Sequence, residues 1–138
     1  MCGICGFNWD ERFLIKSMID SIVHRGPDDS GLYTSRGISL GNRRLSIIDL
    51  KTGKQPIYNE DKSMCIVFVG EIYNYLDLKP ELEKRGHVFS TESDTEVVLH
   101  AYEEYGEDCL GYLNGMWAIA IWNSNKKELF LSVDRLGI

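Results

Sequence analysis

The chain has 138 residues, 43% of them hydrophobic, which is enough apolar material for one compact domain with a buried core. Acidic side chains outnumber basic ones by 21 to 15, the net charge is -6, and Lys and Arg never cluster beyond a pair. Such a chain is a poor match for a phosphate backbone or an anionic bilayer, and no apolar run approaches the ~20 residues that span a membrane. We therefore expect neither nucleic acid nor membrane as a partner.

The four cysteines occupy positions 2, 5, 65 and 109. The N-terminus shows no basic region followed by an apolar stretch, so we expect a cytoplasmic protein with reduced thiols. Cys65 and Cys109 lie in apolar stretches, which is typical of small buried side chains. The sequence assigns them no chemistry.

The first half of the chain predicts strands with one helix among them. Residues 3–7 have the pattern of a short strand, and the apolar spacing over 11–23 predicts an amphipathic helix. The turn residues of "HRGPDDSG" predict a loop, and strands are expected over about 32–35 and 38–43. The apolar run 64–69 does not alternate, so this strand is expected to be covered on both faces.

The second half predicts two helices followed by a pair of strands. Pro80 is expected near the start of one helix and Gly86 after its end, with a strand over about 87–91. Ser93 and Glu96 have the spacing of a capping box, which predicts a second helix beginning there. "MWAIAIW" and "LFLSV" predict two strands joined by a turn. Doubly covered strands with helices between the strand groups indicate a layered α+β sandwich.

Cys2 directly follows the initiator methionine in "MCGICGF". If that methionine is removed, one residue carries both a thiol and a free α-amine. A thiol needs a base to become a strong nucleophile, and an α-amine with a pKa near 7.7 to 8.0 can act as that base. The sequence therefore permits a nucleophile without a separate histidine, although a cysteine at this position is usually incidental.

Cys2 and Cys5 also form a C-x-x-C pair, which has two alternative interpretations. It could be half of a zinc site, but the sequence has neither a second C-x-x-C nor paired histidines. It could be a redox dithiol, but that motif normally begins a helix after a strand, whereas these residues resemble the strand itself. We expect Cys5 to be a core residue.

Seven further segments appear in a fixed order: "MCGICG", "HRGPDDSG", "NRRLSIIDL", "QPIYNED", "VGEIYNY", "SDTE" and "LNGMWAIAIW". Together they resemble the glutamine-hydrolysing domain of asparagine synthetases, a class II glutamine amidotransferase with an N-terminal catalytic cysteine. The resemblance covers the chain from Cys2 to its last residue. It implies an N-terminal-nucleophile hydrolase fold, an αββα four-layer sandwich, over residues 1–138.

The resemblance also implies a role for each matching residue. Cys2 matches the nucleophile that forms a thioester with glutamine, and the guanidinium of Arg44 matches the group that binds the substrate carboxylate. Asp94 matches the carboxylate that receives the substrate ammonium, and Glu71 a second residue on that side. Gly70 matches the residue whose backbone N–H donates to the oxyanion. Ile47 and Ile48 match residues whose backbone lines the glutamine pocket.

Val69 departs from the family pattern, which has asparagine at this position. That asparagine donates its side-chain amide to the oxyanion, and valine donates nothing. Losing one such donor typically costs about 10² to 10³ in rate. We therefore expect glutamine binding with weakened turnover, and the alternative is a catalytically impaired domain that binds glutamine or a partner. His24, Arg25 and Asp28 match a loop near the site and are expected to be structural.

The family's synthetase half, which uses ATP and magnesium, has no counterpart in these residues because no "SGGxDS"-type phosphate loop is present. The resemblance thus implies a glutaminase domain without cofactor or metal, incomplete in its last strands, that supplies ammonia to a synthetase domain in cis or in trans. The sequence does not identify the ammonia acceptor. It also leaves the oligomeric state open, a homo-oligomer included.

Overall fold

The computed structural model describes residues 2–46 and 52–138, and its strands form two antiparallel sheets. The three-stranded sheet has the order β1-β3-β2 and the four-stranded sheet the order β4-β5-β6-β7. The strands are β1 (Gly3–Phe7), β2 (Asp29–Ser35), β3 (Ile38–Arg44), β4 (Ile57–Tyr58), β5 (Met64–Ile72), β6 (Gly115–Asn123) and β7 (Glu128–Val133). The helices are α1 (Arg12–Ser21), α2 (Tyr75–Lys84) and α3 (Asp94–Tyr105), with short 3₁₀ turns at Val23–Arg25 and Gly106–Gly111.

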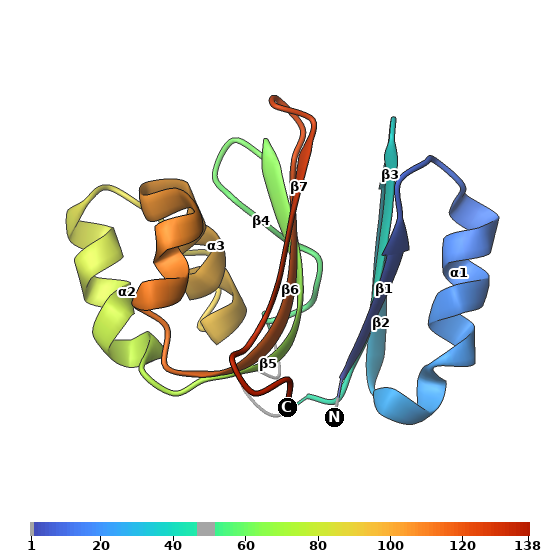
Figure 1. The fold of residues 1–138 in the computed structure, drawn as a ribbon, viewed down its shortest axis with the longest axis horizontal. Helices are drawn as coiled ribbons and strands as arrows, with labels where there is room; N and C mark the ends of the chain where they lie inside the picture. The colour runs from blue at the N-terminus through green and yellow to red at the C-terminus, as the bar shows by residue number, and fades with distance from the viewer. Residues whose placement is uncertain (1, 47–51) are drawn as a thin grey trace.

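Four layers result from this arrangement (Figure 1). Helix α1 covers the outer face of the three-stranded sheet, helices α2 and α3 cover the outer face of the four-stranded sheet, and the two sheets face each other. The predicted αββα sandwich is therefore confirmed. None of the helices in the described part of the chain has the length and apolar character needed to cross a membrane.

Strand β5 lies in the middle of the molecule and explains the unbroken apolar run in the sequence. Ile66, Phe68 and Ile72 pack on the helical side, while Cys65 and Val67 pack between the two sheets. Both faces are thus covered, as predicted, and the alternation of a strand distributes the apolar side chains between two separate cores. The register pairs β5 with β6 along its whole length, from Met64 opposite Asn123 to Ile72 opposite Gly115.

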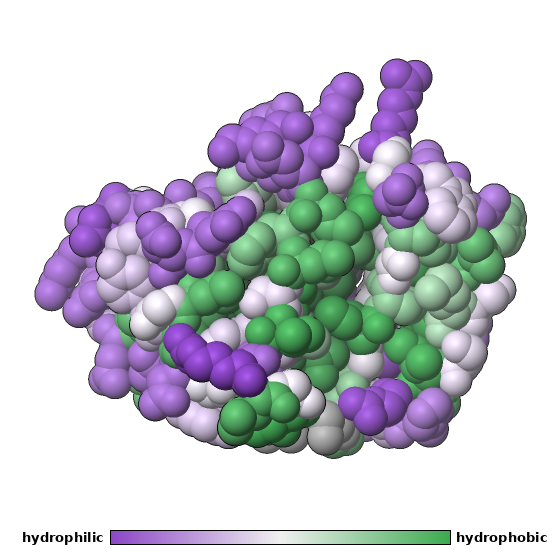
Figure 2. Space-filling model, in the orientation of Figure 1, coloured by the Kyte–Doolittle hydropathy of each residue, from purple (hydrophilic) through white to green (hydrophobic). Residues whose placement is uncertain are grey.

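Exposed apolar side chains gather along β7 and the segment after it. Figure 2 shows apolar atoms over the sheets in the middle of this face and polar atoms around α2. Leu131, Val133 and Leu136 are 65%, 68% and 83% exposed. Asp134 anchors the segment that follows β7, because its carboxylate accepts hydrogen bonds from the backbone N–H groups of Leu136 and Gly137, each at 2.9 Å.

Three predictions of local structure need correction. Strand β2 begins at Asp29, inside the stretch predicted as a loop. Helix α2 begins at Tyr75, so Pro80 lies inside it and not near its start. The carbonyl of Asn74 accepts the N–H groups of Asp77 and Leu78, which starts the helix well before the proline.

The third correction concerns the strand predicted over 87–91, a segment that has no strand structure. Carboxylates take up its backbone N–H groups in place of a neighbouring strand: Val88 donates to Glu60 at 2.8 Å, and Thr91 donates to Glu96 at 2.7 Å. Helix α3 begins where predicted, with Ser93 accepting from the N–H of Thr95 at 3.2 Å. The capping box is incomplete, because the carboxylate of Glu96 binds the 90–91 segment and not the N–H of Ser93.

Candidate active site

A cavity of about 460 Å³ lies between the two sheets at the end of the sandwich where the described chain begins and ends. Both sheets, the start of α3 and the last residue contribute to its wall. The residues that line it include Cys2, Gly3, Ile4, Ile22, His24, Arg25, Arg44, Leu45, Gln55, Val69, Gly70, Glu71, Ser93, Asp94, Thr95, Met116, Ala118 and Ile138. Six of the predicted site residues therefore share one cavity: Cys2, Arg44, Val69, Gly70, Glu71 and Asp94.

The sulfur of Cys2 is held at the wall of this cavity by backbone groups. The N–H of Leu45 donates to Sγ at 3.2 Å, and the thiol lies 3.5 Å from the carbonyl oxygen of the same residue. The guanidinium of Arg25 donates through Nε to the carbonyl of Cys2 at 3.3 Å. Because Cys2 is half-buried, its sulfur is both fixed in position and open to a molecule in the cavity.

Cys5 lies on the other face of β1, where a Cβ built on Gly41 would be 3.1 Å from its sulfur and would also touch Ile19 of α1. Burial raises the pKa of the Cys5 thiol, which disfavours the thiolate. Cys2 lines the cavity between the sheets, whereas the sulfur of Cys5 lies on the α1 side of the sheet, so the two thiols do not face a common metal ion. This geometry argues against the C-x-x-C zinc site. Cys5 packs against α1 but is half-buried, so the core position expected for it is met only in part.

Arg44 is the last residue of β3 and Asp94 the first residue of α3. Both are nearly buried, at 7% and 5% exposure, yet both line the cavity. A guanidinium and a carboxylate at the wall of one cavity can bind a ligand that carries both a negative and a positive group. The α-carboxylate and α-ammonium of an amino acid are such a pair.

The carboxylate of Asp94 accepts the N–H of Ile72 at 3.0 Å. Burial raises the pKa of Asp94, and the charge of Glu71 raises it further, while hydrogen bonds from Ile72, Thr95 and Ser93 oppose the increase. A bound cation would favour the charged form of this carboxylate. A perturbed titratable group in a cavity is typical of a functional site.

Val69, Gly70 and Glu71 come from the end of β5 that faces the cavity. Gly70 has a φ of 144°, and a Cβ on it would overlap the carbonyl oxygen of Met116 on the neighbouring strand. Only glycine fits at this position, which explains why Gly70 stands between Val69 and Glu71 in the sequence. Val69 pairs with Ala118 across the sheet, so the wall at this point is apolar.

The remaining predicted residues have mixed outcomes. Ile47 and Ile48 lie outside the described residues. Asp28 is structural as expected, because its carboxylate accepts the N–H of Ser46 at 2.9 Å. His24 and Arg25, which were also expected to be structural, line the cavity.

Leu45 contributes to the site in a way that no sequence pattern could indicate, because it acts through its backbone N–H and any residue type can supply that group. Cys65 and Cys109 are 2% and 0% exposed, which confirms the prediction of buried thiols. Burial raises their pKa values to about 12 and about 11.

A family profile for the glutamine amidotransferase domain matches residues 1–138. The chain belongs to the glutamine amidotransferase family. Two relatives from Bacillus subtilis (strain 168), asparagine synthetases [glutamine-hydrolyzing] 1 and 3, are 47% and 41% identical to this amidotransferase domain over 100% of its length. The alignments cover 23% and 24% of those relatives, so the chain spans about a quarter of their length.

Solved structures confirm the fold of this amidotransferase domain. Glutamine phosphoribosylpyrophosphate amidotransferase from B. subtilis superposes with a TM-score of 0.80 at 19% identity, over 99% of this chain and 38% of that one. The allosteric regulatory enzyme of purine biosynthesis superposes with a TM-score of 0.55 at 23% identity, over 73% of this chain and 24% of that one. The likeness supports the N-terminal-nucleophile hydrolase architecture.

Proposed function

We propose that this domain hydrolyses the side-chain amide of glutamine to glutamate and ammonia through a thioester on Cys2. The observation that carries the proposal is that Cys2, Arg44 and Asp94, which come from three separate stretches of sequence, line one cavity between the sheets. The family membership and the identity to glutamine-hydrolysing asparagine synthetases support the same reaction.

In this mechanism, removal of the initiator methionine frees the α-amine of Cys2, which takes the proton of the thiol. The sulfur adds to the carbonyl carbon of the amide, and the resulting oxyanion accepts the N–H of Gly70. The C–N bond then breaks, the proton held by the amine goes to the leaving nitrogen, and ammonia departs. Water hydrolyses the thioester, which releases glutamate and restores the thiol.

Substrate orientation follows from the charges of the wall. Arg44 would bind the α-carboxylate through its planar guanidinium, and Asp94 would bind the α-ammonium, with Glu71 beside it. Since these two anchors fix both ends of the amino-acid group, they determine the depth at which the side-chain amide meets the sulfur of Cys2. Holding the amide next to the nucleophile in this way typically lowers the activation barrier of an enzymatic reaction by several kcal/mol.

Val69 weakens one part of this mechanism, because an aliphatic side chain offers no hydrogen bond to the oxyanion. We infer that the domain binds glutamine well and turns it over slowly. The second candidate function, a glutamine-binding or partner-binding domain without turnover, is favoured by the same residue.

The ammonia would serve a synthetase domain in cis or in trans that uses ATP and magnesium, since the relatives are named asparagine synthetases and the chain spans about a quarter of their length. A cytoplasmic location is part of the proposal, and four free thiols are consistent with it. A homo-oligomer is compatible with the proposal.

Covalent labelling tests the reaction. We expect a diazoketone that mimics glutamine to add to residue 2, as seen by mass spectrometry of the N-terminal peptide, and we expect the adduct only in protein that has lost its initiator methionine. Cys2→Ala should abolish labelling and ammonia release, whereas the matched control Cys5→Ala, which alters the other face of β1, should retain both. Labelling without any release of ammonia would support the binding-domain candidate, and the absence of both would contradict the proposal.

A further inference from the structure

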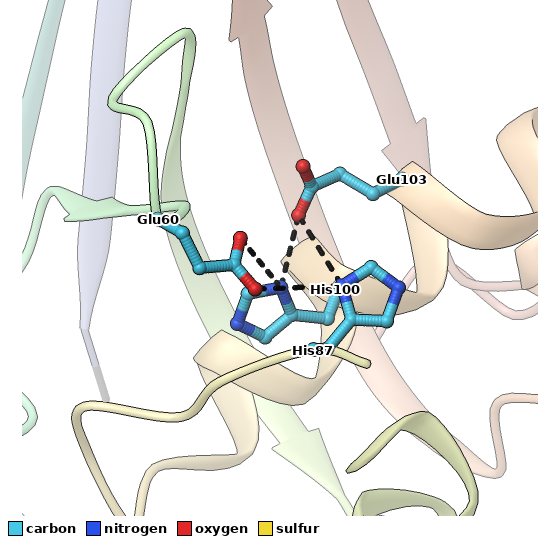
Figure 3. A group of neighbouring side chains, drawn as sticks. All are labelled: Glu60, His87, His100 and Glu103. Atoms are coloured by element: carbon cyan, nitrogen blue, oxygen red, sulfur yellow. Dashed lines mark hydrogen bonds and ion pairs between the residues drawn. The ribbon is translucent and has the colours of Figure 1, made fainter. Parts of the chain in front are cut away.

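A second group of functional side chains lies on the helical side of the four-stranded sheet and lines no part of the cavity described above. Glu60 comes from the turn between β4 and β5, His87 from the segment after α2, and His100 and Glu103 from consecutive turns of α3 (Figure 3). Each residue directs one ligand atom toward the others, and the four atoms lie within 4.8 Å of one another. It is the one group of this kind among the described residues, and it joins three segments that are distant in sequence.

The separations between these atoms are near the spacing of ligands around one ion, although most are somewhat longer. Nδ1 of His100 lies 2.9 Å from Glu103 and 3.9 Å from Glu60, and Nδ1 of His87 lies 3.8 Å from Glu103 and 3.7 Å from Glu60. Four ligands placed 2.0 to 2.1 Å from a tetrahedral centre are separated from one another by about 3.3 Å. The atoms lie up to 4.8 Å apart, so shifts of up to about an ångström would place all four around a single ion.

Direct hydrogen bonding explains only part of this group. The contact between His100 and Glu103 is a hydrogen bond, but the other three separations of 3.7 to 3.9 Å are longer than any hydrogen bond. Burial lowers the pKa of His100, but the neighbouring Glu103, Glu96 and Glu60 outweigh it and raise the value to about 9. An imidazolium at His100 would satisfy its contact with Glu103 and would attract Glu60, yet it does not explain why Nδ1 of His87 also lies 3.7 and 3.8 Å from these two carboxylates.

The carboxylates of the group are oriented by other protein groups. The N–H of Val88 donates to Oε1 of Glu60 at 2.8 Å, and Nδ2 of Asn59 donates to Oε1 of Glu103 at 2.7 Å. One oxygen of each carboxylate is thus fixed. Oε2 of Glu103 faces both histidines, whereas Glu60 faces His87 with Oε1 and His100 with Oε2. Ligands whose orientation is fixed in advance lose less entropy when they bind an ion.

His87 has an outer carboxylate in the arrangement that metal-bound histidines prefer. Nε2 of His87 lies 3.3 Å from Glu104, which also pairs with Arg85 at 2.9 Å. Nε2 of His100 is buried 3.7 Å from Glu96, which is too far for a hydrogen bond, so this nitrogen has no hydrogen-bond partner among the described residues. A carboxylate behind the second ring nitrogen fixes the tautomer and increases the basicity of the ligating one.

We propose that Glu60, His87, His100 and Glu103 bind one divalent transition-metal ion, for which Zn²⁺ is the best chemical match. Two imidazoles and two carboxylates suit zinc in both donor type and number. Four protein ligands close the coordination sphere, so the ion is structural and holds the turn before β5 and the segment after α2 against α3. The proposal does not depend on the reaction assigned to the cavity.

Direct metal binding by the purified protein tests this proposal. We expect protein stripped with a chelator to take up one equivalent of Zn²⁺ in competition with a chromophoric indicator, and to melt at a higher temperature in its presence. Glu60→Gln and Glu103→Gln should each weaken the affinity by at least about 100-fold, and Glu104→Gln, which alters only the outer carboxylate, by about 10- to 100-fold. The matched control Glu107→Gln changes an exposed carboxylate on the neighbouring turn and should bind Zn²⁺ like the unmodified protein.

Circular dichroism of each variant without metal separates loss of ligand from loss of fold, and Glu60 is the safest position because its side chain is 38% exposed. Co²⁺ as a substitute should give the visible bands of a tetrahedral site without a sulfur charge-transfer band. Absence of stoichiometric Zn²⁺ binding, equal binding by a folded Glu60→Gln variant, or a thiolate spectrum would each overturn the proposal.

Discussion

Replacing Val69 by asparagine should increase the glutaminase activity of this domain. Val69 is half-buried in the cavity wall. Asparagine has one more side-chain heavy atom than valine, and a cavity of about 460 Å³ accommodates it. One oxyanion donor is worth about 2.7 to 4 kcal/mol, or 10² to 10³ in kcat. Because the new amide must also adopt one favourable rotamer, we expect an increase of at least about tenfold.

The measurement is kcat and KM for glutamine, obtained from ammonia release under saturating substrate. The increase should appear in kcat with KM nearly unchanged, since the donor acts on the oxyanion and not on the bound amide. Val133→Asn is the matched control, because it makes the same substitution on a neighbouring exposed strand position that does not line the cavity. Equal kcat values for Val69→Asn and the unmodified domain, with both proteins folded, would refute the reasoning.

Three further predictions concern the charged residues. Arg44→Lys should raise KM for glutamine by about 10- to 100-fold with a smaller effect on kcat, because the bidentate hydrogen bond to the carboxylate is lost; steady-state kinetics at fixed pH measures it. Burial raises the pKa of Asp94, so this carboxylate should become protonated at a higher pH than an ordinary aspartate, and KM for glutamine should rise as the pH falls through that range. Asp94→Asn should remove this pH dependence and weaken glutamine binding at every pH. Burial alone would raise the pKa of Asp134, but four backbone N–H donors hold the pKa of this carboxyl below its usual value. The charged Asp134 therefore stabilises the fold at pH values above its unfolded pKa, and this stability is lost as the pH falls through its folded pKa. Thermal melting should show that Asp134→Asn lowers the melting temperature more at neutral than at acidic pH. A difference in melting temperature that does not change with pH would contradict this role of Asp134.

The sequence predicted the layers well because periodicity reports burial directly. The unbroken apolar runs of β5 and β6 indicated strands covered on both faces, and both lie in the interior of the sandwich. The strand predicted over 87–91 was wrong for a physical reason. Its backbone N–H groups bind the side-chain carboxylates of Glu60 and Glu96, and residue propensity does not reveal side-chain partners for a backbone group.

The site was predictable only in part. A cysteine after the initiator methionine suggested a nucleophile, and the resemblance supplied Arg44 and Asp94, which the fold places in the same cavity. The sequence could not predict the hydrogen bond from the Leu45 N–H to Cys2, because a backbone group does not depend on the type of side chain. The Glu and His group likewise has no local motif, since its members come from three segments that only the packing of α3 brings together.

The meeting of Cys2 and Ile138 at the wall of one cavity has a practical consequence for anyone who purifies this protein. An affinity tag that stays attached ahead of Cys2 would leave no free α-amine there, and any residues that follow Ile138 begin at the wall of the cavity. The hairpin turn between β6 and β7 lies at the opposite end of the sandwich (Figure 1). A short epitope inserted in that turn could serve for purification and would leave the cavity accessible.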